Sequence, residues 1–216
     1  MYKKKSFFIT FEGIEGSGKS FQSRRLYKIL REKKIPCILT REPGGTKGAE
    51  KIRNIILEDY FDSKTHQQFN KYTDTLLYLA ARNEHIISKL KSALLNSKKQ
   101  IVICDRFMDS TTAYQVYGKG VNKNFVDLIH KHILRNIEPD LTFILTTKIS
   151  KAMQRLKKRK KKNRYDKFSK NFYIKVQRAF INIAKSYKKR CFLVDNSKDT
   201  KETEETIIKK VLELIN

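Results

Sequence analysis

A glycine-rich stretch close to the N-terminus has the residue types that bind phosphate groups. Residues 13–20 read Gly-Ile-Glu-Gly-Ser-Gly-Lys-Ser, which fits the phosphate-loop spacing G-x-x-x-x-G-K-[ST]. Glycines allow backbone turns that aim N–H groups at an anion, Lys19 would reach the β- and γ-phosphates, and the Ser20 hydroxyl suits a magnesium ion. The candidate nucleotide-binding residues are Gly13, Ile14, Glu15, Gly16, Ser17, Gly18, Lys19 and Ser20. A glycine-rich turn without a ligand is the alternative.

A second pair of charged residues follows the apolar run at residues 101–104. Asp105 and Arg106 come at the end of this run, which reads as a buried strand. Ligands of open α/β sheets bind at the carboxyl ends of the strands. There Asp105 could hold magnesium or its water shell, and Arg106 could clamp a phosphate with two parallel hydrogen bonds. A structural ion pair between the two residues is the alternative.

Short apolar segments alternate with longer amphipathic ones along the chain. Strands are predicted at residues 6–12, 36–41, 100–105, 141–147 and 191–195. Helices are predicted at residues 19–33, 47–59, 72–98, 110–116, 124–136, 150–162, 168–189 and 200–215, with Ser150 as one N-cap. Nearly continuous apolar runs are typical of strands buried on both faces. Repeated strand–helix units therefore predict an α/β fold, with a five-stranded parallel sheet flanked by helices on both sides.

Length, apolar runs and cysteines limit the class of protein. The 216-residue chain is long enough for one α/β domain, and we expect residues 1–216 to form a single domain. No apolar run is long enough for a signal peptide or a membrane span, so we expect a cytoplasmic protein with no membrane partner. Cys37, Cys104 and Cys191 lie in apolar segments without CxxC pairing, which is typical of buried reduced thiols.

Positive charge is concentrated in one part of the chain. The formal net charge is +26, and residues 148–190 hold 18 Lys or Arg against one acidic residue, Asp166. Such a field attracts polyanions, whether nucleotides or nucleic acid. A surface on which Lys fills most solvated positions is the alternative, and it explains the dense run at residues 155–164 least well. Because aromatic residues do not interleave this run, a nucleic-acid partner is not expected.

Four motifs in a fixed order resemble the thymidylate kinase family. They are FEGIEGSGKS at residues 11–20, LTREPGGT at 39–46, LLYLAAR at 76–82 and DRFMDSTTAYQ at 105–115, followed by an arginine-containing lid at about residues 155–167. The resemblance spans nearly the whole chain, from Phe7 to about Phe192. It implies a P-loop NTPase-like fold of the nucleoside monophosphate kinase type. It also implies transfer of the γ-phosphoryl group of Mg-ATP, the co-substrate with its Mg²⁺ cofactor, to dTMP.

The third motif carries the base recognition that the resemblance implies. Tyr78 and Arg82 lie four residues apart, which puts a ring and a guanidinium on one face of a helix. In the family this pair stacks on the thymine ring and donates to its exocyclic oxygen. Arginine donors suit the O4 acceptor of thymine and oppose the amino group of cytosine. Core packing is the alternative for Tyr78.

The resemblance assigns the other substrate contacts as well. Arg53 and Arg106 would hold the acceptor phosphate, and Thr111 would lie near the base edge. Tyr114 and Gln115 would line the deoxyribose side, where a ring close beneath the sugar excludes a 2′-hydroxyl. With the loop after the second strand, the substrate-binding set is Glu42, Pro43, Arg53, Tyr78, Arg82, Arg106, Thr111, Tyr114 and Gln115.

The lid departs most from the family pattern. The phosphate loop has Glu15, which the family places near the sugar, and no arginine, so the chain resembles the bacterial type in which lid arginines neutralise the migrating group. Arg159 or Arg164 is expected to do so, with Arg155 facing the ATP phosphates or adenine. Asn163 stands where the pattern has an aspartate. The catalytic set is Lys19, Arg106, Arg159, Arg164 and Glu15, and the metal ligands are Ser20 and Asp105.

Other activities share these features. A deoxynucleoside kinase needs a carboxylate base for the 5′-hydroxyl, whereas a monophosphate acceptor needs arginines, so Arg53 and Arg106 favour the monophosphate. A nucleoside monophosphate kinase with another base specificity and a nucleic-acid-dependent ATPase are further alternatives. The resemblance also implies a homodimer, for which the helical segment at 72–98 could supply the seam.

Overall fold

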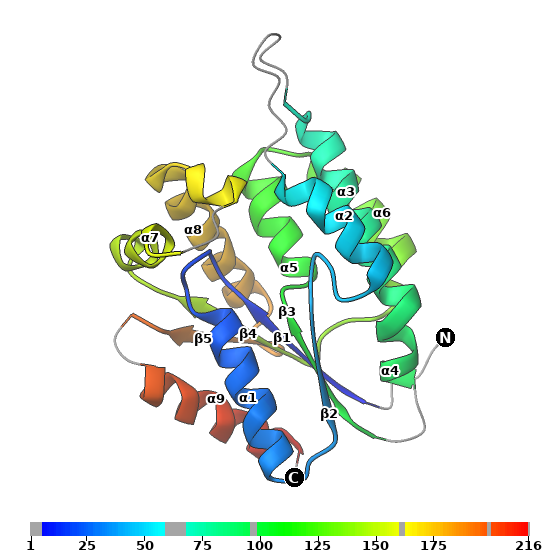
Figure 1. Ribbon diagram of the computed structural model, residues 1–216, viewed down its shortest axis with the longest axis vertical. Coiled ribbons are helices and arrows are strands. Elements are labelled where there is room, and N and C mark those ends of the chain that lie inside the picture. The colour runs from blue at the N-terminus through cyan, green and yellow to red at the C-terminus, as the bar shows by residue number, and fades with distance from the viewer. Residues whose placement is uncertain (1–5, 59–67, 96–98, 160–162, 198–199, 216) are drawn as a thin grey trace.

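The computed structural model describes residues 6–58, 68–95, 99–159, 163–197 and 200–215, and its centre is a parallel sheet (Figure 1). The strands are β1 (Phe7–Glu12), β2 (Cys37–Arg41), β3 (Ile101–Asp105), β4 (Leu141–Thr146) and β5 (Cys191–Asp195). Their order is β2-β3-β1-β4-β5, and every neighbouring pair is parallel. The predicted α/β fold with a five-stranded parallel sheet is confirmed.

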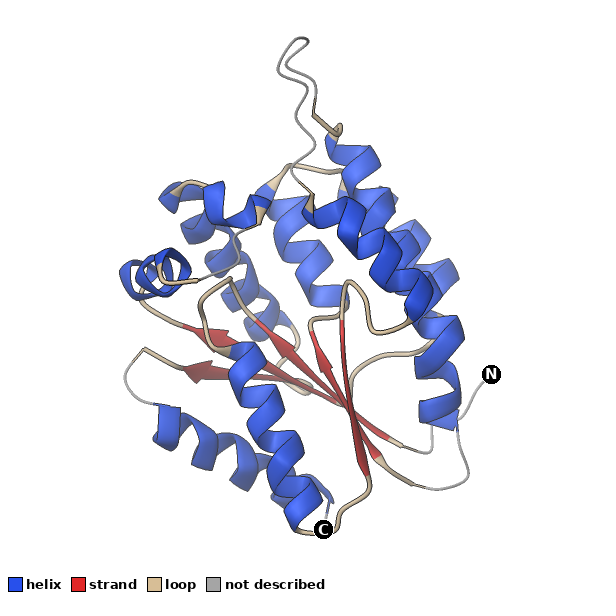
Figure 2. Cartoon of the chain, viewed as in Figure 1, coloured by secondary structure: helices blue, strands red, loops and turns tan. Residues whose placement is uncertain are grey.

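Helical segments connect successive strands and cover the sheet. They are α1 (Lys19–Glu32), α2 (Lys47–Leu57), α3 (Lys71–His85), η1 (Ile86–Leu90), α4 (Lys91–Leu95), α5 (Met108–Thr111), η2 (Thr112–Gly118), α6 (Lys123–Leu134), α7 (Ile149–Lys157), η3 (Arg164–Lys167), α8 (Lys170–Ser186) and α9 (Thr200–Ile215). Figure 2 shows the strands between helices on both sides. None of the described helices combines the length and the apolar character that crossing a bilayer requires.

Successive side chains along a strand point to opposite faces of the sheet, and helices cover both faces. In β1, Ile9 and Phe11 pack with α1 and α9, whereas Phe8 packs on the opposite face with η1 and α4. In β4, Ile144 belongs to the cluster built around α8. All of these side chains are fully buried, as expected for strands enclosed on both faces. Cys37, Cys104 and Cys191 are buried free thiols, as predicted.

The sheet register brings three charged strand ends to one edge. Asp105 of β3 lies beside Phe11 of β1 and beside Arg41 of β2. Glu12, the last residue of β1, lies beside Ile144 of β4. Because the carboxyl ends of parallel strands meet at one edge, the segments that follow them can line a common site.

Three helix predictions need correction. The segment predicted as one helix at 72–98 contains a π-helical turn, η1, between α3 and α4, and its residues 96–98 lie outside the described residues. The segment predicted at 110–116 is divided between α5 and the π-helical η2. Ser150 is not an N-cap, because α7 begins at Ile149 and its N-cap Lys148 makes no side-chain cap hydrogen bond. The Lys148 N–H instead donates to the Ser197 hydroxyl at 3.0 Å, a partner distant in sequence. Residues 160–162 of the predicted lid helix lie outside the described residues, and α7 ends at Lys157.

Candidate active site

The phosphate loop joins the end of β1 to the start of α1 (Figure 1). Gly16 and Gly18 have φ angles of +76° and +95°, in the region that favours glycine. A Cβ atom at Gly16 would lie 2.6 Å from the carbonyl oxygen of Ala152, so a larger residue does not fit. Gly18 is the N-cap of α1 without a side-chain cap, which leaves backbone N–H groups of the first turn for an anion.

Lys19 lies buried at the base of this loop. Its Nζ donates to the carbonyl oxygen of Ile14 at 3.1 Å. Burial, together with the charge of Arg106, lowers the pKa of Lys19 to about 8. Two further hydrogen bonds hold the loop in place. The Ser17 N–H donates to the Ile14 carbonyl, and Asn196 Nδ2 donates to the Ser17 carbonyl. An anion bound in the loop would give the Lys19 ammonium group a negatively charged partner in addition to the Ile14 carbonyl.

A cavity of about 330 Å³ opens between the phosphate loop and α3. Of the predicted site residues, its lining contains Glu15, Lys19, Ser20, Glu42, Pro43, Arg53, Tyr78, Arg82, Asp105, Arg106, Thr111, Tyr114, Gln115 and Arg159. The predicted residues outside this lining are Gly13, Ile14, Gly16, Ser17, Gly18, Arg155 and Arg164. The size suits a small-molecule ligand. The fold thus brings together residues from every motif used in the sequence analysis.

Arg106 makes several hydrogen bonds in the cavity lining. Its Nη1 donates to the Gly13 carbonyl at 3.0 Å and to the Ser110 hydroxyl at 2.9 Å, and its Nη2 donates to Glu15 Oε1 at 2.7 Å. Burial disfavours its charge, but Glu15 and Tyr114 outweigh burial and raise the pKa of Arg106. The guanidinium therefore stays charged and is aimed before any ligand binds.

Glu15 is held between two partners. It accepts from Arg106 on one oxygen and from the Tyr114 hydroxyl on the other. Burial opposes its ionisation, but Arg106 and Lys19 hold the pKa of Glu15 below its usual value. Glu15 is therefore an ionised acceptor within the phosphate loop, and Tyr114 is a donor to it. The predicted sugar-side residues Glu15 and Tyr114 do lie in contact.

Arg82 lies at the other end of the cavity and is 3% exposed. Its Nε donates to Glu42 Oε2 at 2.7 Å, and its Nη1 donates to the Thr111 hydroxyl at 2.8 Å. Nη1 also reaches His130 Nε2 at 2.7 Å, and Nη2 donates to the Phe107 carbonyl at 2.9 Å. Burial and the charge of Arg82 lower the pKa of His130 to about 3, so this imidazole is a neutral acceptor. An arginine has five N–H donors, so these bonds leave at most one for a ligand oxygen.

Glu42 and His130 were not predicted as partners of Arg82. The Glu42 carboxylate also accepts from His85 Nδ1 at 3.0 Å, and His85 Nε2 lies 2.7 Å from the Thr40 hydroxyl. Burial opposes ionisation of Glu42, but Arg82 and His85 lower its pKa. Glu42 thus ties the loop after β2 to α3. No sequence spacing relates His130 on α6 to Arg82, so pattern reasoning had no signal for this contact.

Tyr78 lies one helical turn before Arg82 and contacts the lid. Burial raises the pKa of Tyr78, and its hydroxyl is hydrogen-bonded to Arg164. Arg164 also forms an ion pair with Asp74, and Lys119 donates to the same carboxylate at 2.6 Å. Asp74 is 1% exposed. Arg164 is therefore held against α3, and it does not belong to the cavity lining.

Arg53 and Pro43 form the wall between α2 and the loop after β2. Arg53 Nη1 donates to the Pro43 carbonyl at 2.7 Å. Burial and the charge of Arg41 lower the pKa of Arg53. Arg41 itself is exposed and pairs with Glu50 at 2.9 Å. This wall thus adds two guanidinium groups to the cavity lining.

Asp105 and Ser20 are the oxygen donors that could hold a cation. Both line the cavity. Oδ1 of Asp105 is buried, and it has no hydrogen-bond partner among the described residues. Within the same described part of the chain, no group of three or more His, Cys, Asp or Glu side chains could hold a metal ion. The site therefore fits a hard cation that takes most of its ligands from phosphate and water.

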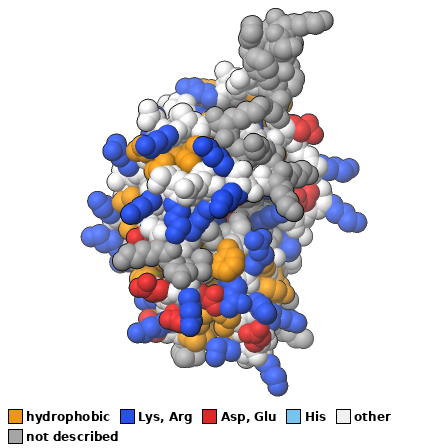
Figure 3. Space-filling model, turned by 60° about the vertical axis from the view of Figure 1, so that its left-hand side comes forward, with side chains coloured by type: hydrophobic (Ala, Val, Ile, Leu, Met, Phe, Trp, Pro, Cys, Tyr) orange, Lys and Arg blue, Asp and Glu red, His pale blue; other side chains and the backbone are white. Residues whose placement is uncertain are grey.

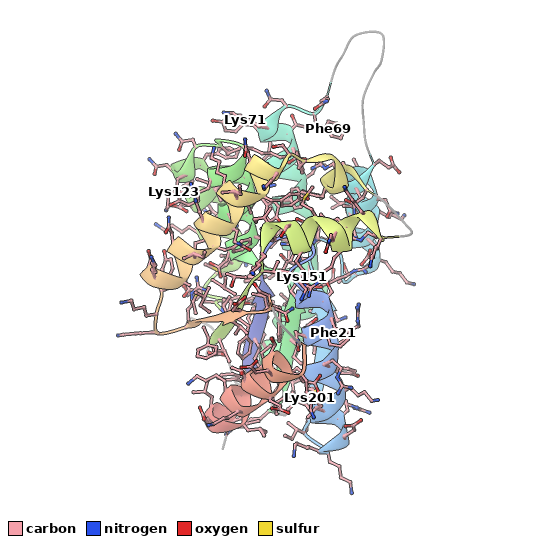
Figure 4. All side chains as sticks on the ribbon, turned by 90° about the vertical axis from the view of Figure 1, so that its left-hand side faces the viewer. Phe21, Phe69, Lys71, Lys123, Lys151 and Lys201 are labelled. Atoms are coloured by element: carbon pink, nitrogen blue, oxygen red, sulfur yellow. The ribbon has the colours of Figure 1, made fainter. Side chains whose placement is uncertain are left out.

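The lid side of the cavity is built from α7 and the segment after it. Arg155 on α7 donates to the Gly16 carbonyl at 2.8 Å, and Lys151, labelled in Figure 4, donates to the Ser197 carbonyl at 2.7 Å. Arg159 is exposed and lines the cavity. The upper left part of the face in Figure 3 carries mostly Lys and Arg side chains, whereas acidic ones are interspersed lower down. Between the two predicted lid arginines, the geometry favours Arg159 for contact with phosphates.

Six further lining residues are not in the predicted set of site residues. They are Arg24, Arg41, Leu57, Ser110, Asn163 and Tyr165. Ser110 could have been predicted from the sequence, because it follows Arg106 by four residues within the same motif. Arg24 follows the phosphate loop by one helical turn and could also have been found. Tyr165 could not, since its position depends on ring contacts with Tyr114 and Phe168.

Comparisons with known proteins identify the family of the chain. The thymidylate kinase family model matches residues 11–207. The thymidylate kinase of Aster yellows witches'-broom phytoplasma is 40% identical over 210 residues, which cover 96% of this chain and 97% of the relative. The thymidylate kinase of Vesicomyosocius okutanii is 38% identical over 200 residues, with 93% and 94% covered.

A solved structure agrees with the fold as well. The crystal structure of thymidylate kinase from Ehrlichia chaffeensis superposes with a TM-score of 0.74 at 34% sequence identity. The match covers 96% of this chain and 98% of that structure's chain. Both the family match and the relatives span most of the chain, including every element that lines the cavity. The chain belongs to the thymidylate kinase family.

Proposed function

We propose that this protein transfers the γ-phosphoryl group of Mg-ATP to dTMP, giving dTDP and ADP. The observation that carries the proposal is the cavity that joins the phosphate loop to the Tyr78–Arg82 face of α3, with Arg106 between them. The relatives named thymidylate kinase support it. One end of the cavity is suited to a triphosphate, the other to a planar base, and the centre to an anionic acceptor.

The partners of Glu15 argue against a deoxynucleoside kinase. Such an enzyme needs a carboxylate base to take the 5′-hydroxyl proton. Glu15 is the carboxylate within the phosphate loop, but its oxygens accept from Arg106 and from Tyr114, and its pKa is lowered. A weakly basic, already occupied carboxylate is poorly suited to that task. A dTMP phosphate, which needs cations and no base, fits the site better.

In the proposed mechanism, the protein supplies positive charge and orientation. Backbone N–H groups of the phosphate loop and Lys19 hold the β- and γ-phosphates. Arg106 grips the acceptor phosphate, and the exposed Arg159 adds charge to the migrating group when the lid closes over it. Tyr78 stacks on the thymine. Because phosphoryl transfer needs little covalent help from the protein, these contacts and the exclusion of water account for the catalysis.

We also propose a magnesium ion held by Asp105 and Ser20. The buried Asp105 Oδ1 atom without a hydrogen-bond partner supports this assignment. With Ser20 at the start of α1 and Asp105 at the end of β3, the two side chains would hold the ion next to the phosphate loop, where it would supply positive charge to the phosphates.

Exposed apolar side chains support the proposal of a homodimer. Ile55 of α2, Leu76 of α3, Ile87 of η1 and Leu128 of α6 are between 44% and 62% exposed. These helices lie side by side in Figure 1, and α3 contacts both α2 and α6. A second copy of the chain would cover this face.

We also make proposals for the domain organisation and the cellular compartment. We propose one domain of residues 1–216 with a lid at about residues 155–167. We place the protein in the cytoplasm, because its three cysteines are buried free thiols of the kind found in reducing compartments. A nucleic-acid partner is not proposed, despite the net charge of +26.

An acceptor panel tests the proposed reaction. ADP formation from Mg-ATP is measured with dTMP, dUMP, dCMP, dGMP, AMP, thymidine and single-stranded nucleic acid. We expect turnover with dTMP and weaker turnover with dUMP. Turnover with thymidine but not dTMP would mean a nucleoside kinase. ADP formation stimulated by nucleic acid alone would replace the proposal with a nucleic-acid-dependent ATPase.

A further inference from the structure

Glu12 is a buried carboxyl group that the proposed mechanism leaves without a role. It ends β1 and is fully buried. Its Oε1 accepts from the N–H of Phe107 at 2.8 Å and from the N–H of Ser110 at 3.2 Å, and its Oε2 bonds to the Ser110 hydroxyl at 2.5 Å. All three donors belong to the segment after β3. Glu12 thus binds the segment that carries Arg106.

The backbone of Arg106 needs such support. Its φ angle is +74°, a conformation that a residue with a side chain rarely adopts. The Arg106 N–H donates to the Phe11 carbonyl at 2.9 Å, and the next N–H, that of Phe107, donates to Glu12. Two successive amides are therefore fixed by two successive residues of β1. The left-handed turn is held by the strand that leads into the phosphate loop.

The Ser110 hydroxyl links Glu12 to the guanidinium itself. Its oxygen lies 2.5 Å from Glu12 Oε2 and accepts from Arg106 Nη1 at 2.9 Å. Burial and the Asp109 carboxylate raise the pKa of Glu12 to about 8. The link holds in both protonation states, because a serine oxygen can accept from Arg106 while it either donates to Glu12 or accepts from it.

We propose that Glu12, acting through Ser110 and the Phe107 amide, is a positioning residue that aims Arg106 at the acceptor phosphate. Arg106 Nη1 has the Ser110 oxygen on one side and the Gly13 carbonyl on the other. The pair of Glu12 and Ser110 therefore fixes the clamp relative to the phosphate loop. This inference rests on the proposed function, because it takes Arg106 as the clamp.

Binding of dTMP and of thymidine by calorimetry tests the inference, because thymidine lacks only the phosphate. Ser110→Ala removes the link and should weaken dTMP binding by about tenfold, while thymidine binding stays within about twofold. Ser110→Thr keeps the hydroxyl and should restore dTMP binding. Ser6→Ala is the matched control, because it removes a buried serine hydroxyl that donates to the Ala93 carbonyl far from the cavity.

Two variants of Glu12 complete the test. Glu12→Gln keeps an acceptor for the two amides and a donor for the Ser110 oxygen, so dTMP binding should stay within about threefold of wild type. Glu12→Met has similar length but no polar atom, and it should show the phosphate-specific loss of Ser110→Ala. If Glu12→Met does not fold, the Ser110 variants decide.

The outcomes separate the inference from the proposed function. If Ser110→Ala weakens dTMP and thymidine binding equally, or neither, the positioning role is wrong. A Ser110→Thr variant as defective as Ser110→Ala would also overturn it. If the wild-type protein binds thymidine as tightly as dTMP, Arg106 is no phosphate clamp, and the proposed function fails together with the inference.

Discussion

The two walls of the cavity are built in different ways. The acceptor wall consists of Arg82, which is buried, and Arg106, which is half-buried, with their partners. Both guanidinium groups are bonded to carboxylates and carbonyls. The lid wall is formed by Arg159, whereas the lid arginines Arg155 and Arg164 lie outside the cavity lining. Arg159 is exposed, and Arg155 reaches the phosphate loop through its bond to the Gly16 carbonyl.

This difference indicates that the acceptor wall recognises dTMP, whereas the lid wall supplies positive charge to the migrating phosphoryl group. Cations of the acceptor wall have their direction set by neighbours before a ligand binds, so a small displacement there should cost much activity. In the proposed mechanism, Arg159 acts on the migrating group when the lid closes over the ligand. We therefore expect variants of the acceptor wall to affect dTMP binding and variants of the lid wall to affect turnover.

Among the variants that test the difference between the two walls, Arg106→Ala should have the largest effect. It removes the clamp and leaves Glu15 without its main partner, so kcat/KM for dTMP should fall about 10³-fold. The coupled assay of ADP formation measures the effect. Arg31→Ala, an exposed arginine in the last turn of α1, is the control for losing one positive charge. Near-normal turnover of Arg106→Ala would refute its role.

The two lid arginines should behave differently from each other. Arg159→Ala should lower kcat about 100-fold with little change in the KM for dTMP, because its charge acts on the migrating group. Arg164→Ala should mainly raise the KM for dTMP, since Arg164 is bonded to Tyr78 and Asp74. Steady-state kinetics of both variants check this. The reverse pattern would exchange their roles.

Arg82→Ala tests the base end of the acceptor wall. The KM for dTMP should rise more than tenfold, and the KM for ATP should change little. Removing Arg82 also leaves Glu42 and His130 buried without their shared partner, so unfolding should become easier by about 3 kcal/mol. Thermal unfolding measures the second effect. An equal rise in both KM values would remove Arg82 from the base site.

The smallest expected effect is the pH dependence of kcat/KM for ATP, which should differ from that of dTMP binding. The folded-state pKa of Lys19 is lowered to about 8, so Lys19 loses its proton, and with it the charge for the phosphates, as the pH rises through 8. From pH 7 to pH 8.5, kcat/KM for ATP should fall about fourfold. The Kd for dTMP should stay constant over this range, because the acceptor wall arginines remain charged. A flat kcat/KM profile would place the pKa of Lys19 elsewhere.

Local patterns predicted the fold and the phosphate loop, and the family resemblance implied most of the other lining residues. The phosphate loop and the strand end at Asp105 follow from spacing and from apolar runs, so their positions could be predicted. Contacts between distant segments could not. Glu12 to Ser110 and Arg82 to His130 depend on which strands and helices become neighbours, and no spacing in one sequence records that. Ser150 was wrong as a cap because α7 begins at Ile149, which puts Ser150 inside the first turn of the helix.

Tracing the label from γ-³²P-labelled ATP tests the central claim most directly. With dTMP present, we expect the label in the β-phosphate of dTDP, with one dTDP formed for each ADP. Label in dTDP should disappear almost entirely in Arg106→Ala. Label released as inorganic phosphate, with dTMP unchanged, would contradict phosphoryl transfer to dTMP.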